Sequence, residues 1–164
     1  MSTTQHPDAG PSGTASLHAI CGIDDERITA FGLLHEAHRR ITQTLDRSLR
    51  EQVGVGDVPF EVVLRIGRSP DGRLMMSELA TQLGLTSGGV TRLVDRVTEA
   101  GYVERTGCPD DRRVQWVVLT PAGRELLERA LAVHLDDLQR ELVDRLTPEE
   151  LVALTTALDK LRQP

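Results

Sequence analysis

One short stretch near the middle of the chain restricts the possible folds more than any other part of the sequence. The hydroxyl of Ser77 is suited to cap a first helix, and Gly84 is suited to end that helix in a tight turn. Thr86 or Ser87 can then cap a second helix, which Gly101 ends. One apolar stripe on this second helix is expected to pack inward, and it is formed by Val90, Leu93, Val94 and Val97. The sequence therefore predicts two short helices joined by a tight turn.

Two β-prone runs follow the second helix. They cover residues 102–106 and 114–119, and a segment that contains both Gly and Pro separates them. Such a separation predicts a long hairpin loop, with Asp111, Arg112 and Arg113 near its tip. Helix, turn, helix and two-stranded hairpin in this order describe a winged helix-turn-helix. We therefore expect a mainly α fold with a small β-hairpin wing.

Amphipathic helices flank this unit on both sides. Apolar residues recur at steps of three and four over residues 25–51 and 121–146, and a short helix is expected at 59–67. Thr147 and Glu150 form a capping-box pattern ahead of a last helix. These apolar stripes exceed what one small domain can cover. We expect helices from both ends to pack against a second copy as a homodimer, and a bundle within one chain is the alternative.

These elements predict the following organisation. Residues 1–22 are rich in Ser, Thr, Gly and Pro and are expected to form a mobile tail. Residues 23–164 are expected to form a single domain, with a winged helix over about 57–120. Dimerisation helices are expected at about 25–51 and 121–162.

Charge is unevenly distributed along the chain. The net charge is −6, but residues 73–113 carry equal numbers of acidic and basic side chains, and every basic one is arginine. The excess of acid therefore lies outside the winged unit. Arginine is the side chain best suited to forked contacts with phosphates and base edges. The charge pattern is thus compatible with a nucleic-acid partner.

Several classes of protein find no support in the sequence. There is no apolar run long enough to span a membrane and no basic-then-apolar start typical of a secretory signal. Two cysteines are too few for a disulfide scaffold, so we expect a cytoplasmic protein. We find no nucleophile elbow, phosphate-binding glycine loop or metalloprotease helix. The paired acids Asp136 and Asp137 are better explained as a solvated helix face, and His134 is expected to be a packing residue. We therefore expect neither an enzyme nor a cofactor.

The hairpin resembles a known signature. Residues 111–120 read Asp-Arg-Arg-Val-Gln-Trp-Val-Val-Leu-Thr, similar to the wing signature of the MarR family of bacterial transcriptional regulators. Residues 76–80 and 90–96 resemble the two DNA-binding helices of that family. The resemblance extends over about residues 25–162.

The resemblance implies a homodimeric regulator, usually a repressor, that binds a palindromic double-stranded operator. A recognition helix over 86–100 would enter the major groove, and a wing over 102–119 would reach the minor groove. Arg113 would be the wing-tip side chain, and Asp111 would pair with arginine to hold the tip in shape. Family members commonly bind small effectors between their dimerisation and DNA-binding parts.

The residues themselves agree with DNA contact. The predicted contact set combines hydroxyls, a glycine that permits close approach and outward guanidinium groups: Ser77, Thr86, Ser87, Gly88, Thr91, Arg92, Arg96, Asp111, Arg112 and Arg113. The competing interpretation is that the helix arginines form pairs along their own helix. Asp95 could pair with Arg92, and Glu99 could pair with Arg96.

Sensing residues are less well marked. His35 and His38 share a helix face and are expected near the dimer interface, where a small effector could bind. Glu36 points elsewhere, so no metal site is predicted. Cys21 lies just before the first helix, but two nearby carboxylates oppose thiolate formation. Two alternatives stay open: an oxidant- or metal-sensing regulator, and a winged helix used as a protein–protein interaction module, which the acidic total charge favours.

Overall fold

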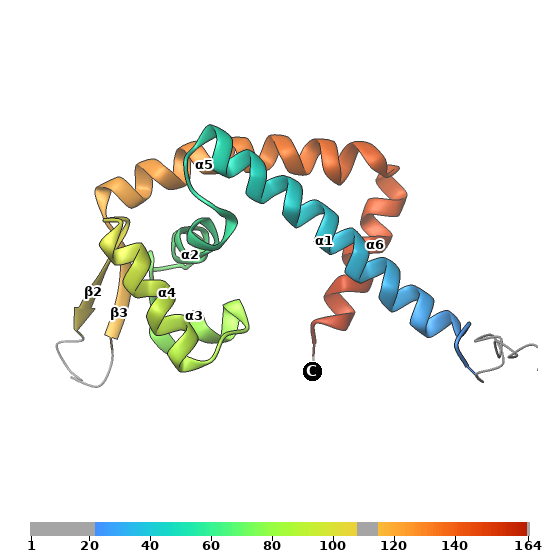
Figure 1. Cartoon of the computed structure of the whole chain (residues 1–164), viewed down its shortest axis with the longest axis horizontal. Coiled ribbons are helices and arrows are strands. Elements are labelled where there is room, and N and C mark those ends of the chain that lie inside the picture. The colour runs from blue at the N-terminus through green and yellow to red at the C-terminus, as the bar shows by residue number, and fades with distance from the viewer. Residues whose placement is uncertain (1–21, 108–114, 164) are drawn as a thin grey trace, which may run out of the picture. The chain divides into compact units, whose positions relative to one another are not determined.

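The computed structural model describes residues 22–107 and 115–163 (Figure 1). The chain divides into two compact units, residues 1–38 and 39–164. In chain order the elements are α1 (Glu26–Gln52), α2 (Asp57–Arg68), β1 (Arg73–Met75), α3 (Met76–Leu83), α4 (Ser87–Glu99), β2 (Val103–Gly107), β3 (Gln115–Leu119), α5 (Pro121–Glu141), η2 (Val143–Arg145) and α6 (Pro148–Leu161). The structure is mainly helical, as predicted.

The first unit contains the N-terminal part of α1. Asp25 caps this helix, because its Oδ1 accepts a hydrogen bond of 2.8 Å from the backbone N–H of Arg27. The apolar side chains of Ile28, Phe31 and Leu34 are exposed, Phe31 to 72%. This part of α1 therefore keeps an apolar surface that the described chain does not cover.

The second unit has an apolar core centred on α2. Phe60, Val63 and Ile66 are fully buried there. The inward stripe predicted for the recognition helix is confirmed, because α4 contributes Val90, Leu93, Val94 and Val97 to the same core. Leu126 and Ala130 of α5 complete it. Because this core gathers α2, α4 and α5, it fixes α4 with one face inward and the other outward.

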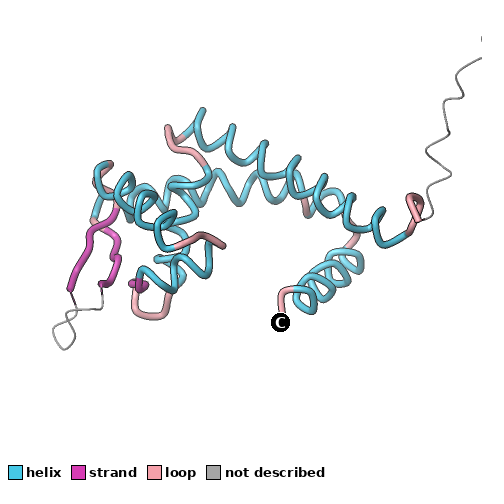
Figure 2. The backbone as a smooth tube through the Cα atoms, turned by 60° about the horizontal axis from the view of Figure 1, so that its bottom comes forward, coloured by secondary structure: helices cyan, strands magenta, loops and turns pink. Residues whose placement is uncertain are grey.

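The sheet has three strands where the sequence predicted two. The hairpin of β2 and β3 is present and extends as a ribbon (Figure 2). In addition, β1 pairs antiparallel with the other edge of β3, placing Leu74 opposite Val117 and giving the order β1-β3-β2. Three residues are too few to show strand periodicity in a sequence. Only the pairing with β3 makes this segment a strand.

The start of α3 also differs from the prediction. Ser77 was expected to cap this helix, but α3 begins at Met76 and its N-cap is Met75. The carboxylate of Glu78 accepts a 2.8 Å hydrogen bond from the N–H of Met75. Ser77 therefore lies in the first turn, where its side chain is exposed.

The turn between α3 and α4 forms as predicted. Gly84 ends α3 with a left-handed φ of 62°, which glycine adopts without steric cost. Thr86 is the N-cap of α4, and its Oγ1 accepts a 3.1 Å hydrogen bond from the N–H of Gly89. Gly101 ends α4 with a φ of 80°. Local capping thus defines both ends of the predicted recognition helix.

A tight joint connects the wing to α5. The N–H of Thr120 donates to the carbonyl of Tyr102 at 3.1 Å, and its hydroxyl donates to the carbonyl of Gly101 at 2.6 Å. The same hydroxyl accepts from the N–H of Gly123 at 3.0 Å, so Thr120 is the N-cap of α5. A Cβ on Gly123 would lie only 1.9 Å from the carbonyl oxygen of Tyr102. The start of α5 therefore packs directly on the end of α4 and the start of β2.

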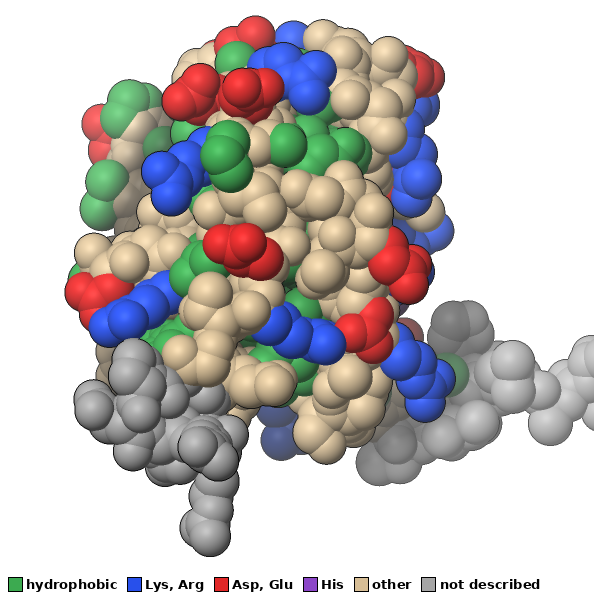
Figure 3. Space-filling model, turned by 90° about the vertical axis from the view of Figure 1, so that its left-hand side faces the viewer, with side chains coloured by type: hydrophobic (Ala, Val, Ile, Leu, Met, Phe, Trp, Pro, Cys, Tyr) green, Lys and Arg blue, Asp and Glu red, His purple; other side chains and the backbone are tan. Residues whose placement is uncertain are grey.

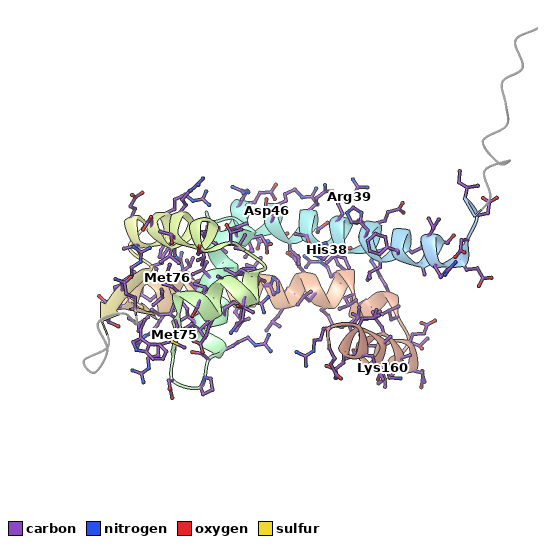
Figure 4. All side chains as sticks on the ribbon, turned by 90° about the horizontal axis from the view of Figure 1, so that it is seen from below. His38, Arg39, Asp46, Met75, Met76 and Lys160 are labelled. Carbon is purple, nitrogen blue, oxygen red and sulfur yellow. The ribbon has the colours of Figure 1, made fainter. Side chains whose placement is uncertain are left out.

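Asp46, labelled in Figure 4, joins α1 to α2 inside the second unit. Its carboxylate accepts a 2.7 Å hydrogen bond from the Arg50 side chain and a 2.8 Å hydrogen bond from the N–H of Asp57. These two donors, Arg50 first, lower the pKa of Asp46 below its usual range. The bond to Asp57 holds the start of α2 against the end of α1.

The C-terminal helices depart from the prediction in two places. α5 ends at Glu141 rather than 146, and the short helix η2 follows it. Asp137, expected on a solvated face, is fully buried and pairs with Arg140. His134 packs at 4.8 Å from the ring of Phe60, as expected of a packing residue. The inward register of α5 accounts for the burial of Asp137, because it lies three residues after His134.

Candidate nucleic-acid interface

The outward face of α4 carries the predicted contact residues together. Ser87, Gly88, Thr91, Arg92 and Arg96 are all exposed. The N-cap residue immediately before the helix is exposed as well. One face of the helix thus offers hydroxyls, a glycine and two guanidinium groups to a partner, while the opposite face is held in the core.

A salt bridge that the sequence did not suggest crosses from the wing to this face. Nη2 of Arg105, on β2, lies 2.7 Å from Oδ1 of Asp95 and donates to the carbonyl oxygen of Thr91 at 3.3 Å. The sequence separation of ten residues gives no helical spacing that would reveal the pair. Asp95 is therefore engaged by the wing and not by the expected partner, Arg92.

The two helix arginines stay unpaired. Within the described residues, neither Arg92 nor Arg96 forms an ion pair or a side-chain hydrogen bond, so the expected pairing of Arg96 with Glu99 is also absent. Both guanidinium groups keep all their donors available. This is the arrangement that contact with phosphates or base edges requires.

A cavity of about 380 Å³ lies between α3, α4 and β3. Its lining includes Met75 and Met76, which Figure 4 labels at the start of α3, together with Ser77, Ser87 and Thr91. Three of the predicted contact residues therefore border one hollow. A second cavity of about 280 Å³ lies on the other side of α4, with Arg96 and Tyr102 in its lining.

Comparison with known proteins identifies the family to which this chain belongs. The model of the MarR family matches residues 53–114. "Multiple antibiotic resistance protein MarR" of Salmonella typhimurium is 32% identical over 124 residues, which cover 74% of this chain and 85% of that protein. The chain belongs to the MarR family. It is a winged helix-turn-helix transcriptional regulator and not an enzyme.

Two further comparisons bear on the site. The HTH-type transcriptional repressor IacR of Pseudomonas putida is 32% identical over 139 residues, which cover 84% of this chain and 78% of that protein. The crystal structure of Sco3205, a MarR family transcriptional regulator from Streptomyces coelicolor in complex with DNA, gives a TM-score of 0.78 at 31% identity. It covers 85% of this chain and 93% of that one.

The remaining predicted site residues do not belong to α3 or α4. Asp111, Arg112 and Arg113 of the wing tip, and Cys21, lie outside the described residues. His35 and His38 lie on the first unit's part of α1, where both are exposed. Their predicted place in an effector pocket stays a prediction.

Three further observations concern the described residues. On the face that carries β2 and β3, acidic and basic side chains are interspersed (Figure 3), consistent with the balanced charge of residues 73–113. In residues 22–107 and 115–163, no three His, Cys, Asp or Glu side chains are grouped to hold a metal ion. No helix of the described chain is both long and apolar enough to cross a membrane.

Proposed function

We propose that this MarR family protein is a repressor that binds a palindromic operator as a homodimer and is released by a small ligand. The observation that carries the proposal is the pair of exposed, unpaired guanidinium groups of Arg92 and Arg96 on α4. Asp95, the acidic residue between them, is already engaged by Arg105. The outward face is thereby left free for the negatively charged backbone of a duplex.

Exposed apolar side chains in the terminal helices support the homodimer. Phe31 on α1 is 72% exposed, and Val152 and Leu161 on α6 are 66% and 72% exposed. Side chains of this kind are usually covered in a stable assembly, and a two-fold dimer is the commonest way to cover them. Two recognition helices related by a two-fold axis would match the two halves of a palindromic site.

We infer that the wing contributes a second contact. By its match to the family signature, Arg113 would enter the minor groove, with Arg112 and Asp111 beside it. A narrow, A·T-rich minor groove concentrates negative potential and so favours an inserted guanidinium group. The repressor role follows the naming of its relative IacR as a transcriptional repressor.

The cavity between α3 and α4 supports ligand release. Because Ser77, Ser87 and Thr91 line it and also belong to the predicted DNA contacts, a molecule that filled it would compete with the duplex. An apolar ligand would suit the methionine side chains in the same lining. A pocket formed near His35 and His38 at the dimer interface would be the second candidate for an effector site.

Binding to the duplex upstream of the protein's own gene, compared with a scrambled duplex, tests the proposal. We expect Arg92→Ala and Arg96→Ala to weaken specific binding by roughly 5- to 150-fold where they contact bases, since one bidentate contact contributes about 1–3 kcal/mol. Arg113→Ala should also weaken it. Arg129→Ala, an exposed arginine on α5, is the matched control and should bind normally. Equal affinity for both duplexes would favour the protein–protein interaction module instead.

A further inference from the structure

We propose that Arg105 is a positioning residue for DNA binding, which acts through Asp95 to keep the outward face of α4 ready for the duplex. The inference rests on the DNA-contacting role of α4 proposed above. It goes beyond that role because Arg105 belongs to the wing strand β2 and not to the recognition helix.

The contact geometry makes Arg105 a link between two rigid elements. One nitrogen, Nη2, reaches both the carboxylate of Asp95 and the carbonyl of Thr91, which lie one helical turn apart on α4. On the strand side, Arg105 pairs with Val117 of β3, a fully buried residue of the core. The Arg105 side chain therefore links a strand that is paired in the sheet to a helix that is packed on the core.

This link adds a second point of attachment between the helix and the wing. At its C-terminal end α4 already continues into β2 through Gly101, and the N–H of Tyr102 bonds to the carbonyl of Val97 at 3.1 Å. Thr91 lies well back along the helix from that turn. The contact of Arg105 with Thr91 and Asp95 therefore joins the wing to α4 at a point separate from this turn.

The link also has an electrostatic consequence. An unpaired carboxylate at Asp95 would face the same direction as the predicted phosphate contacts and would repel them. It also lies three residues from Arg92, a spacing at which a carboxylate and a guanidinium pair along a helix. Arg105 neutralises Asp95 and thereby leaves Arg92 available. The side chain of Arg105 is 30% exposed and that of Asp95 is 45% exposed, so both are close enough to the surface for this charge balance to reach the duplex.

A double-mutant cycle in the full-length protein tests the proposal. The variants are Arg105→Ala, Asp95→Ala and the double variant, and the probe is a labelled duplex that wild-type protein selects from random-sequence DNA. We expect Arg105→Ala to weaken binding tenfold or more, roughly the effect of one good polar contact. The double variant should regain most of this loss, because it no longer carries an uncompensated carboxylate.

A direct phosphate contact by Arg105 predicts a different result. In that case the double variant would bind as weakly as Arg105→Ala, and its affinity would fall less steeply with salt, by about one unit of the log–log slope. Weak binding by the double variant, or a shallower salt dependence of its affinity, would overturn the proposal. Unchanged binding of Arg105→Ala would overturn it as well. Recovery in the double variant with the wild-type salt slope supports it.

Two controls keep the outcome decisive. Thermal unfolding shows whether each variant is folded, and Arg105→Gln replaces Arg105→Ala in the cycle if the alanine variant does not fold. Failure of the wild-type protein to select any duplex would refute the proposed function itself. A wild-type protein that binds, with additive effects of the two substitutions, would refute only the role of Arg105.

Discussion

Replacing Gly123 by alanine tests the joint between the wing and α5. The new Cβ would lie 1.9 Å from the carbonyl oxygen of Tyr102, a backbone atom that cannot rotate away. The wing or the start of α5 must therefore move. Any such movement strains the 3.1 Å hydrogen bond between Thr120 N–H and the same carbonyl.

The expected loss of stability follows from these two contacts. Overpacking a tight site costs about 1–3 kcal/mol, and a lost hydrogen bond adds about 1 kcal/mol. Together they amount to about 2–4 kcal/mol of the free energy of unfolding. For a protein of this size each kcal/mol lowers the melting temperature by roughly 2–4 °C. The clash in Gly123→Ala should therefore lower the melting temperature by roughly 4–16 °C.

A matched variant separates this steric effect from helix propensity. Gly88 lies in the first turn of α4 as Gly123 lies in the first turn of α5, but a Cβ on Gly88 meets no atom within 4 Å. Both substitutions gain the higher helix propensity of alanine, so the difference between their melting temperatures isolates the clash. Thermal unfolding followed by circular dichroism, without DNA, measures it. If Gly123→Ala and Gly88→Ala melt within about 2 °C of each other, the close packing inferred here is wrong.

Two further predictions concern the helices around the site. Thr86→Ala removes the oxygen that accepts a hydrogen bond from the N–H of Gly89, and it should lower the free energy of unfolding by about 1 kcal/mol. Thr86→Ser keeps the hydroxyl and should leave that free energy unchanged. Equal denaturation midpoints for the two variants would contradict the capping role of Thr86. Burial lowers the pKa of His134 below its ordinary value of 6.5, although Glu61 and Asp137 oppose the shift. The unfolded chain then binds more protons as the pH falls below 6.5, so wild-type stability should decrease between pH 7 and 5 relative to His134→Phe. A pH-independent difference between their denaturation midpoints would exclude this linkage.

The features that the sequence predicted correctly are those with short-range causes. The caps at Thr86 and Thr147 and the left-handed glycines Gly84 and Gly101 act on backbone within about four residues. Their effect does not depend on what packs against them. The inward stripe of α4 was equally visible, because helical periodicity alone separates a buried face from an exposed one.

The features that the sequence did not predict depend on residues far apart in the chain. β1 is a strand only because its three residues pair with the edge of β3. Three residues are too few to show strand periodicity in the sequence. Asp137 is a charged residue of the kind that is usually exposed to solvent, yet the packing of α5 places it in the interior. For the same reason, sequence alone suggested Arg92 as the partner of Asp95.

The sequence by itself determined the winged helix-turn-helix order, the recognition helix and the arginines on it, because capping and periodicity are local properties. Only the tertiary structure decided which of those arginines are free. It brings Arg105 of β2 onto Asp95 through the pairing of β2 with β3 and the packing of α4 on the core. Charge pairing between elements depends on distances in space, which spacing along the chain does not encode.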